Sequence, residues 1–343
     1  NLKKVVPASG VGDEGGYAPN LDSDEDALKA LAKIAGELGH TEDRDELLAR
    51  GERYAAKLAD GYKKNYGDSR FEERGKQPCA NSDEDFELVY SGLVDCIRML
   101  VARGYDLFYN EGLTWTSFSI NDTDQVSTYC NCRTCGAKAN GTGKYKGSPE
   151  GYSGVYLEFV NRAAREIKKE YPGMKLSYIL YDKRVPATIR PEENVIIFYC
   201  SHRCNNHVLG SGECSEEGGS MKFYYGELNG KGYSNTYDEY AIPKWIEYCN
   251  DSGATFYYWY YPENYCYYLH DAPCVYNIYY DIKWLYSLGV KGIFYEGTPS
   301  KVSFSFEYVK ALAASELMWN PEMTVDEYTA QLKKFMRDYY GKG

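Results

Sequence analysis

From residue 82 to the end of the chain, hydrophobic residues recur at helical spacing in some segments and form short continuous runs in others. The first helical segment follows Ser82, a predicted N-cap, and carries Phe86, Val89, Leu93, Ile97 and Leu100. Further helices are expected from Ser153 to the stop at Pro172-Gly173, around 242–249, and over 275–288, 304–318 and 324–340. Thr324 and Glu327 are expected to form a capping box at the last of these. The short runs predict five strands, over 115–120, 176–181, 195–200, 255–261 and 292–296.

Strands that alternate with helices predict an α/β fold with a parallel sheet, and we expect a TIM-type (β/α) barrel. A complete barrel has about eight strands, more than the five counted after residue 100. The stretch between Tyr181 and Val195 is also too short for an ordinary crossover helix. The expected architecture is therefore a barrel that is either partial or lacks its first strands.

Residues 1–75 differ from the rest and are expected to form a separate N-terminal segment, with the barrel region over 76–343. A Gly-rich loop from Gly10 to Pro19 precedes an acidic helix start at 22–26 and a helix that reaches Leu38. A second helix is expected over 45–59, followed by a polar, turn-rich linker over 61–80. The only convincing strand signal in this part lies near Lys4–Val6.

Composition narrows the classes of function. The net charge of −11 argues against nucleic acid as a partner, because phosphate binding needs clustered Lys and Arg. No apolar run approaches the ~20 residues of a membrane span. The chain has 37 tyrosines, which suit half-buried positions in general and also a wet cleft or a sugar platform. No signal peptide is found at its start, which leaves secreted, cell-envelope and cytoplasmic locations open.

Three of the 11 cysteines, Cys130, Cys132 and Cys135, fall within one loop after the 115–120 strand. This spacing favours a metal-binding loop over a disulfide framework, with a structural zinc as the expected ion. The fourth ligand is expected from the segment after another strand, among Cys200, His202, Cys204 and His207. Reduced thiols or a disulfide are the alternatives. A cysteine nucleophile is disfavoured because no Cys-His pair is evident.

Polar and aromatic residues at strand ends are the candidates for chemistry, because β/α proteins build their sites in the loops after strands. Asn121 and Asp122 follow the first strand, and Glu296 ends the last one. Asn and Asp also favour turns, and a strand-end carboxylate often bonds backbone, so ordinary turn and capping roles are the alternatives. The expected substrate contacts are Tyr181, Asp182, His207, Trp259, Tyr261 and Glu263. Ordinary packing is the alternative for the aromatic residues, and metal ligation for His207.

The region from about Gly75 to Gly341 resembles a bacterial family, domain of unknown function 4838. The motifs that carry the resemblance are Ser119-Ile120-Asn121-Asp122 with Cys130-x-Cys132-x-x-Cys135, Phe159 to Ala164 with Tyr171-Pro172, Cys204 to His207, Gly289 to Gly297, Leu317 to Pro321, and Tyr339-Tyr340-Gly341. The family is glycoside-hydrolase-like, and some members are associated with glycoside hydrolase family 163, the endo-acting β-N-acetylglucosaminidases. The resemblance implies an enzyme that cleaves a glycan and needs no cofactor for the reaction.

That implied activity suggests roles for the strand-end residues. Glycoside hydrolysis needs a proton donor, and some families let the N-acetyl group of the substrate attack while a neighbouring residue orients it. Asp122 would be the acid, its pKa raised by apolar surroundings, and Asn121 would hold the acetamido group. Glu296 would be a second carboxylate or an acceptor for sugar hydroxyls. A carbohydrate-binding or scaffolding module that lost catalysis is the second hypothesis.

The N-terminus resembles another family. Gly12 to Leu21 and the helix after it are similar to the acid-bearing loop of enolase, in which the residue equivalent to Glu14 helps the hydroxyl leave. This match covers about the first 40 residues. The later enolase segments that supply magnesium ligands and a lysine base are not found. An enolase-like lyase is therefore the third and weakest hypothesis, and a Gly-rich turn before a capped helix is the simpler interpretation.

Overall fold

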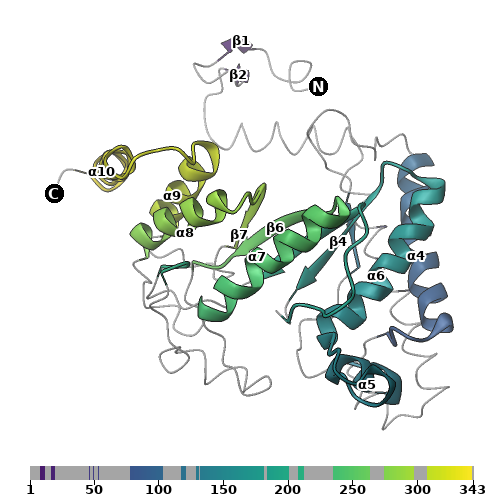
Figure 1. Cartoon of the computed structure of the whole chain (residues 1–343). Helices are drawn as coiled ribbons and strands as arrows, with labels where there is room; N and C mark the ends of the chain where they lie inside the picture. The colour runs from purple at the N-terminus through teal and green to yellow at the C-terminus, as the bar shows by residue number, and fades with distance from the viewer. Residues whose placement is uncertain are drawn as a thin grey trace. The chain divides into compact units, whose positions relative to one another are not determined.

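The computed structural model describes residues 8–11, 17–19, 46, 49, 53, 78–102, 117–120, 129–130, 132–180, 184–200, 208–211, 235–262, 274–296 and 307–341 (Figure 1). The chain divides into two compact units. The first comprises 1–67 with 87–106, and the second comprises 68–86 with 107–343. The division of the sequence at residue 75 stays a prediction.

The described part of the first unit contains a small hairpin. Strand β1 (Ala8–Val11) pairs antiparallel with β2 (Tyr17–Pro19), with a bulge between Ala8 and Gly10. Both ends of the expected Gly-rich loop are thus paired strands of a hairpin. Residues 46, 49 and 53 are helical, which agrees with the helix expected over 45–59. The strand near Lys4–Val6 and the helix over 22–38 lie outside the described residues.

Helix α4 (Asp83–Ala102) confirms the first helix expected from the hydrophobic spacing. The Ser82 hydroxyl accepts a hydrogen bond from the backbone N–H of Asp85 at 3.1 Å, as an N-cap should. Phe86, in its first turn, packs edge-on against Phe159, with ring centroids 5.4 Å apart. Among the described residues, no helix is both long and apolar enough to cross a membrane.

The described part of the second unit is built on five parallel strands in sequential order, β3-β4-β5-β6-β7. The sequence predicted all five, and the bounds are Ser117–Ser119, Lys175–Leu180, Val195–Cys200, Thr255–Tyr260 and Gly292–Tyr295. The α/β class and the parallel sheet are therefore confirmed. The described strands form an open sheet with β3 and β7 at its edges, and closure into a barrel stays a prediction.

The helices of this unit are α5 (Arg133–Asn140), α6 (Gly151–Glu170), α7 (Asn235–Ser252), α8 (Val275–Ser287), α9 (Glu307–Trp319) and α10 (Val325–Tyr340). Three buried tyrosines of the sheet mark the face that the helices cover. Tyr178 of β4 donates to a carbonyl of α6, Tyr199 of β5 to Asp238 of α7, and Tyr260 of β6 to Asp281 of α8. Side chains alternate along a strand, so Phe198, Tyr257 and Trp259 lie on the opposite face, where they are half-buried.

Residues 184–194, which lead into β5, contain no helix, as the short spacing indicated. This segment is held by polar side chains of α6 and of its N-cap. Glu150 accepts hydrogen bonds from the backbone N–H of Thr188 at 3.0 Å and from its hydroxyl. Asn161 donates to the carbonyl of Arg190 at 2.6 Å and accepts from the N–H of Glu192 at 2.9 Å. These contacts replace the packing that a crossover helix would provide.

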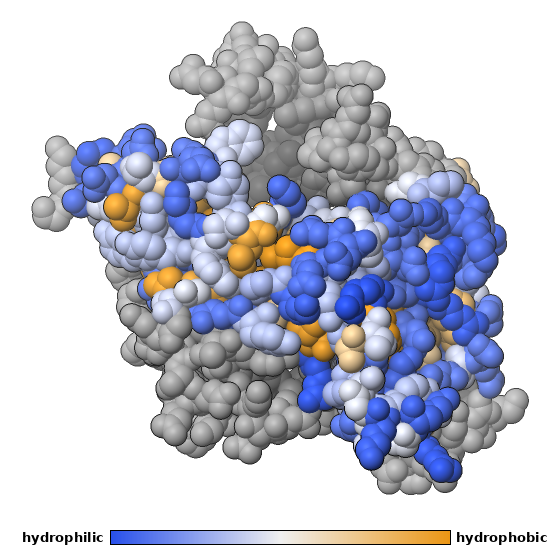
Figure 2. Space-filling model, viewed as in Figure 1, coloured by the Kyte–Doolittle hydropathy of each residue, from blue (hydrophilic) through white to orange (hydrophobic). Residues whose placement is uncertain are grey.

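The structure corrects two details of the sequence prediction. Helix α6 begins at Gly151 rather than at Ser153, because the Ser153 hydroxyl donates to the carbonyl of Arg184 and does not cap the helix. The loop that carries the cysteines also contains a short helix, α5, which ends where Gly141 adopts a left-handed φ of 63°. Figure 2 shows a mainly hydrophilic surface over α5 and α6, with hydrophobic residues in small separate areas.

Candidate functional site

An aromatic cluster with one carboxylate lies at the carboxyl ends of β6 and β7. The indole N–H of Trp259 donates to Oε2 of Glu296 at 3.0 Å. The Trp259 ring stacks on Tyr261 with centroids 5.9 Å apart and meets Phe294 edge-on at 4.9 Å. Phe294 is 48% exposed, so the aromatic surface is accessible beside the carboxylate. We call Trp259, Tyr261, Phe294 and Glu296 the strand-end cluster.

Parallel pairing brings the members of the strand-end cluster together. Trp259 is the register partner of Phe294, so their side chains leave the same face of the sheet. Glu296 continues the ladder one residue past β7, with its N–H donating to the carbonyl of Tyr260 at 2.9 Å. Gly292 is the register partner of Tyr257 and makes room for its ring, because a Cβ on residue 292 would lie 2.6 Å from that ring. A larger residue at position 292 would therefore force the Tyr257 ring to move.

The strand-end cluster has the chemistry of a polar ligand site with apolar walls. Aromatic rings bury the flat faces of a ligand, and the carboxylate accepts its hydroxyl hydrogen bonds. The hydrogen bond from the indole N–H orients the Glu296 carboxylate toward Trp259. A carboxylate has two oxygen atoms with several lone pairs, so it can accept further hydrogen bonds from a ligand. Of the residues predicted for the site, Trp259, Tyr261 and Glu296 are thus brought together, and Phe294 is a neighbour that the sequence analysis did not single out.

The other predicted site residues lie outside the described residues. These are Asn121, Asp122, Tyr181, Asp182, His207 and Glu263. Three of them, Asn121, Tyr181 and Glu263, come directly after a described residue at or near a strand end. The described residues before them are Ile120, Leu180 and Pro262. Ile120 donates to the carbonyl of Ser177 at 3.1 Å, so the chain is still paired with β4 just before Asn121.

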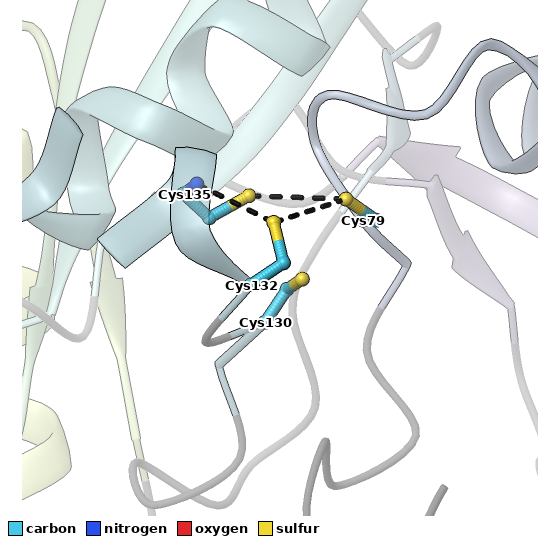
Figure 3. A group of neighbouring side chains, drawn as sticks. All are labelled: Cys79, Cys130, Cys132 and Cys135. Carbon is cyan, nitrogen blue, oxygen red and sulfur yellow. Dashed lines mark hydrogen bonds between the residues drawn. The ribbon is translucent and has the colours of Figure 1, made fainter. Parts of the chain in front are cut away.

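A second constellation consists of four cysteine thiols (Figure 3), which we call the four-cysteine site. The sulfur atoms of Cys79, Cys130, Cys132 and Cys135 all lie within 4.8 Å of one another. The Cys79 sulfur is 3.8 Å from that of Cys132 and 3.9 Å from that of Cys135. Cys130 and Cys135 are fully buried, Cys79 is 5% exposed, and Cys132 is half-buried. All four are free thiols in the structure.

Local structure holds each cysteine in place. Cys132 is the N-cap of α5, and its sulfur accepts the N–H of Cys135 in the first turn at 3.4 Å. The hydroxyl of Tyr156 joins the two chain segments, accepting from the N–H of Cys130 at 3.2 Å and donating to the carbonyl of Pro78 at 3.0 Å. The N–H of Cys79 donates to Asp85 at 2.7 Å. The sulfurs therefore converge because the backbone on both sides is already fixed.

The thiols perturb one another strongly. Hydrogen bonds from Cys135 and Cys79 lower the pKa of the Cys130 thiol to about 4. The same contact with Cys130 raises the pKa of Cys135, and burial raises it further. The hydrogen bond with Cys130 also raises the pKa of Cys79. One thiolate among neutral thiols is favourable, whereas four thiolates this close together need a cation between them.

The three clustered cysteines that were predicted as metal ligands lie together, with a fourth thiol that the sequence did not single out. Cys79 occupies the fourth place, in the turn before α4. Cys200, at the end of β5, is not part of the group, and His202, Cys204 and His207 lie outside the described residues. Cys79 stands in a stretch interpreted as a linker, far from the other three in sequence. The local signal for Cys79 was its position three residues before the N-cap Ser82, in the turn that begins α4.

Comparison with known proteins gives a family and a partial match to an enolase. A family model described as domain of unknown function (DUF4838) matches residues 51–343, starting earlier than the region over which the resemblance was noted. Enolase 1 of Lactobacillus gasseri is 31% identical over 131 residues, a longer stretch than the 40 expected. That match covers 36% of this chain and 28% of the enolase. No solved structure matches the chain.

Proposed function

The chain belongs to the DUF4838 family, and from this premise we propose that it is a glycoside hydrolase whose substrate binds at the carboxyl-terminal edge of the parallel sheet. The observation that carries the proposal is the pair of Trp259 and Glu296, joined at 3.0 Å beside the exposed ring of Phe294. Sugars present apolar ring faces and hydroxyl edges, which aromatic rings and an oriented carboxylate complement. The substrate class is a glycan that contains N-acetylglucosamine.

In this proposal the residues have separate roles. Asp122 donates a proton to the glycosidic oxygen, and Asn121 orients the acetamido group of the substrate. Glu296 accepts a sugar hydroxyl or serves as the second carboxylate, with Trp259 fixing its orientation. Tyr181, Asp182, His207 and Glu263 contribute further hydroxyl contacts, and Tyr261 extends the aromatic wall. No metal takes part in the reaction.

The order of the strands supports this placement of the site. Sequential parallel strands have their carboxyl ends on one edge, where β/α enzymes collect their catalytic loops. The proposed residues follow β3, β4, β5, β6 and β7 in the sequence, so each described strand contributes to the same edge. The barrel that the sequence suggests would close this edge into a cavity, and it is part of the proposal.

The test is release of reducing ends by the full chain from a panel of glycans that contain N-acetylglucosamine. Replacing Asp122 by Asn is expected to lower kcat/KM about 100-fold or more, the usual contribution of a general acid. Glu296→Gln should reduce it as well. Trp259→Phe keeps a ring but removes the donor, so a loss of several-fold is expected. Glu247→Gln, an exposed change on α7, is the matched control and should leave turnover unaltered. Full turnover by Asp122→Asn would disprove the assigned acid.

A non-catalytic carbohydrate-binding module is the second candidate, favoured by the accessible aromatic surface of the strand-end cluster. Binding on a glycan array without release of reducing ends would select this candidate. In that case Trp259→Ala and Phe294→Ala should weaken binding, and Asp122→Asn should leave it intact. An enolase-like lyase is not proposed, since the match spans 28% of the enolase. Glu14 lies outside the described residues.

A further inference from the structure

We propose that Cys79, Cys130, Cys132 and Cys135 bind one Zn²⁺ ion as a closed, structural site, made of residues that the proposed glycan site does not use. Four thiols lose four protons on binding, and the resulting thiolates share the ion, which leaves the site with two net negative charges. No oxidant or reductant is involved, because zinc keeps its valence.

The distances between the sulfur atoms carry the proposal. A tetrahedral ion with Zn–S bonds of about 2.3 Å sets its ligand sulfurs about 3.8 Å apart. The measured separations from Cys79 are 3.8 Å to Cys132 and 3.9 Å to Cys135, and all four sulfurs lie within 4.8 Å of one another. A disulfide requires sulfurs about 2.05 Å apart, so the Cys79 pairs are not bonded. The group is close to the dimensions of a single-ion site.

The geometry also distinguishes zinc from an iron–sulfur cluster. Soft tetrahedral sulfur ligands bind either zinc or iron–sulfur centres. In a cluster several inorganic atoms lie between the cysteines and keep their sulfurs farther apart than the 4.8 Å limit observed for this group. The site therefore has room for one ion. A single iron ion can have the same four-sulfur coordination, and measurement of the bound elements distinguishes iron from zinc.

The surroundings supply the hydrogen bonds that a negatively charged thiolate site requires. The side-chain amide of Asn81 donates to the sulfur of Cys135 at 2.9 Å. The N–H of Cys135 donates to the sulfur of Cys132, which is also the N-cap of α5. The positive end of the α5 dipole thus points to the site. Outer contacts of this kind orient the ligands and stabilise their charge.

Four protein ligands leave no open coordination position, so the ion would not activate water and the role is structural. Two of the thiols are fully buried, which keeps the ion from solvent. The ion would join Cys79 in the turn before α4 to the segment 130–135 after β3. It would thereby fix the carboxyl end of the loop that contains Asn121 and Asp122. This explains a dense group of buried thiols that the proposed hydrolysis does not use.

The first experiment measures the metals in the full chain, purified without chelators, by mass spectrometry of the elements. One zinc per chain is expected. Each of Cys79→Ser, Cys130→Ser, Cys132→Ser and Cys135→Ser should lower zinc content at least several-fold. Cys200→Ser and Cys249→Ser are matched controls, since both residues are buried cysteines outside the group, and they should keep the full zinc content. Loss of zinc with Cys200→Ser but not with Cys79→Ser would overturn the ligand assignment.

A second measurement on the unaltered chain avoids variants that fail to fold. Alkylation under native conditions, followed by peptide mapping, should leave all four cysteines protected, and a chelator should expose them together. Replacement of the ion by Co²⁺ should produce thiolate charge-transfer and tetrahedral ligand-field absorption. No bound metal with disulfide-linked peptides overturns the proposal, as does stoichiometric iron in place of zinc. Zinc binding and glycan cleavage are measured separately, so failure of one leaves the other standing.

Discussion

Buried tyrosines and aspartates form pairs inside the second unit, and this explains part of the high tyrosine content. Asp281 of α8 is fully buried and accepts the Tyr260 hydroxyl at 2.7 Å and the N–H of Leu209 at 2.6 Å. Asp238 of α7 accepts the Tyr199 hydroxyl at 2.8 Å in the same manner. A buried carboxylate is tolerated only when such donors replace water. These tyrosines are therefore structural, in contrast to the strand-end cluster.

Replacing Asp281 by Ala should destabilise the second unit by several kcal/mol, because it leaves two buried donors unpaired at about 1–3 kcal/mol each. Tyr260→Phe removes one partner only and should cost about 1 kcal/mol. Urea unfolding followed by circular dichroism measures both. Asp251→Ala, at an exposed position of α7, serves as the control. An equal decrease in the free energy of unfolding for Asp281→Ala and Asp251→Ala would show that the buried pair does not contribute to stability.

At the scale of the element, the segment 184–194 before β5 depends on polar side chains of its neighbours. Glu150 and Asn161 supply hydrogen-bond partners for its backbone groups. On the other side, Arg190 lies over the ring of Tyr248 at 3.2 Å, and the Tyr248 hydroxyl donates to the carbonyl of Pro186 at 2.9 Å. The segment is thus held between α6 and α7.

Asn161→Ala should loosen this segment, since it removes both a donor and an acceptor for the backbone. We expect faster hydrogen exchange for the amides near residues 188–194, with a stability loss of about 1–3 kcal/mol. Exchange measured by mass spectrometry resolves the segment, and the amides of α10 provide the internal control. Unchanged exchange in 188–194 together with faster exchange elsewhere would contradict the role assigned to Asn161.

The first turn of α10 carries a pH-dependent cap. The backbone N–H and the hydroxyl of Thr324 each donate to the Glu327 carboxylate at 2.8 Å. The backbone hydrogen bond of Thr324 lowers the pKa of Glu327 below its ordinary value. A carboxylate with a lowered pKa stabilises the fold above its unfolded pKa of about 4.3. That stabilisation is lost as the pH falls through the lower, folded value.

Thr324→Ala should lower the stability of α10 by about 1 kcal/mol at neutral pH, because it removes the N-cap side chain. The wild-type helix should also fray progressively as the pH falls below about 4.3, and Glu327→Gln should lose this pH dependence. The readout is exchange protection of the amides of residues 325–328, corrected for the intrinsic effect of pH. A cap that is equally protected at pH values on both sides of 4.3 would contradict the assignment.

At the scale of the whole molecule, the proposed zinc ion joins segments that are distant in sequence within the second unit. Chain connections of this kind limit the freedom of the unfolded state, and the binding free energy adds to folding. The net charge of −11 also favours retention of a cation. The proposed glycan site uses other residues, which lie at strand ends.

Removal of zinc by a chelator should lower the Tm of the full chain by at least about 5 °C, because each kcal/mol corresponds to about 2–4 °C for a unit of this size. Scanning calorimetry before and after dialysis measures the shift, and added zinc should restore the original value. Cys79→Ser should unfold at the lower temperature with or without chelator. A wild-type Tm that chelation does not change would show that no ion contributes to stability.

Local patterns in the sequence determine the elements because their signals lie within a few residues of one another. The five strands, the helices from α4 onward except α5, and the Thr324–Glu327 capping box were predicted in this way. Helix α5 was missed because it is short and lacks hydrophobic spacing. The barrel cannot be derived locally, because closure depends on strands that pair across the whole fold.

The sequence by itself thus determined the α/β class, the order of elements, and three of the four thiols. Only the tertiary structure decided that Cys79 completes their group, that Trp259 orients Glu296, and that α6 replaces a crossover helix for residues 184–194. The physical reason is distance along the chain. Periodicity and capping act between near neighbours, whereas these partners meet only after parallel pairing and helix packing bring remote segments together.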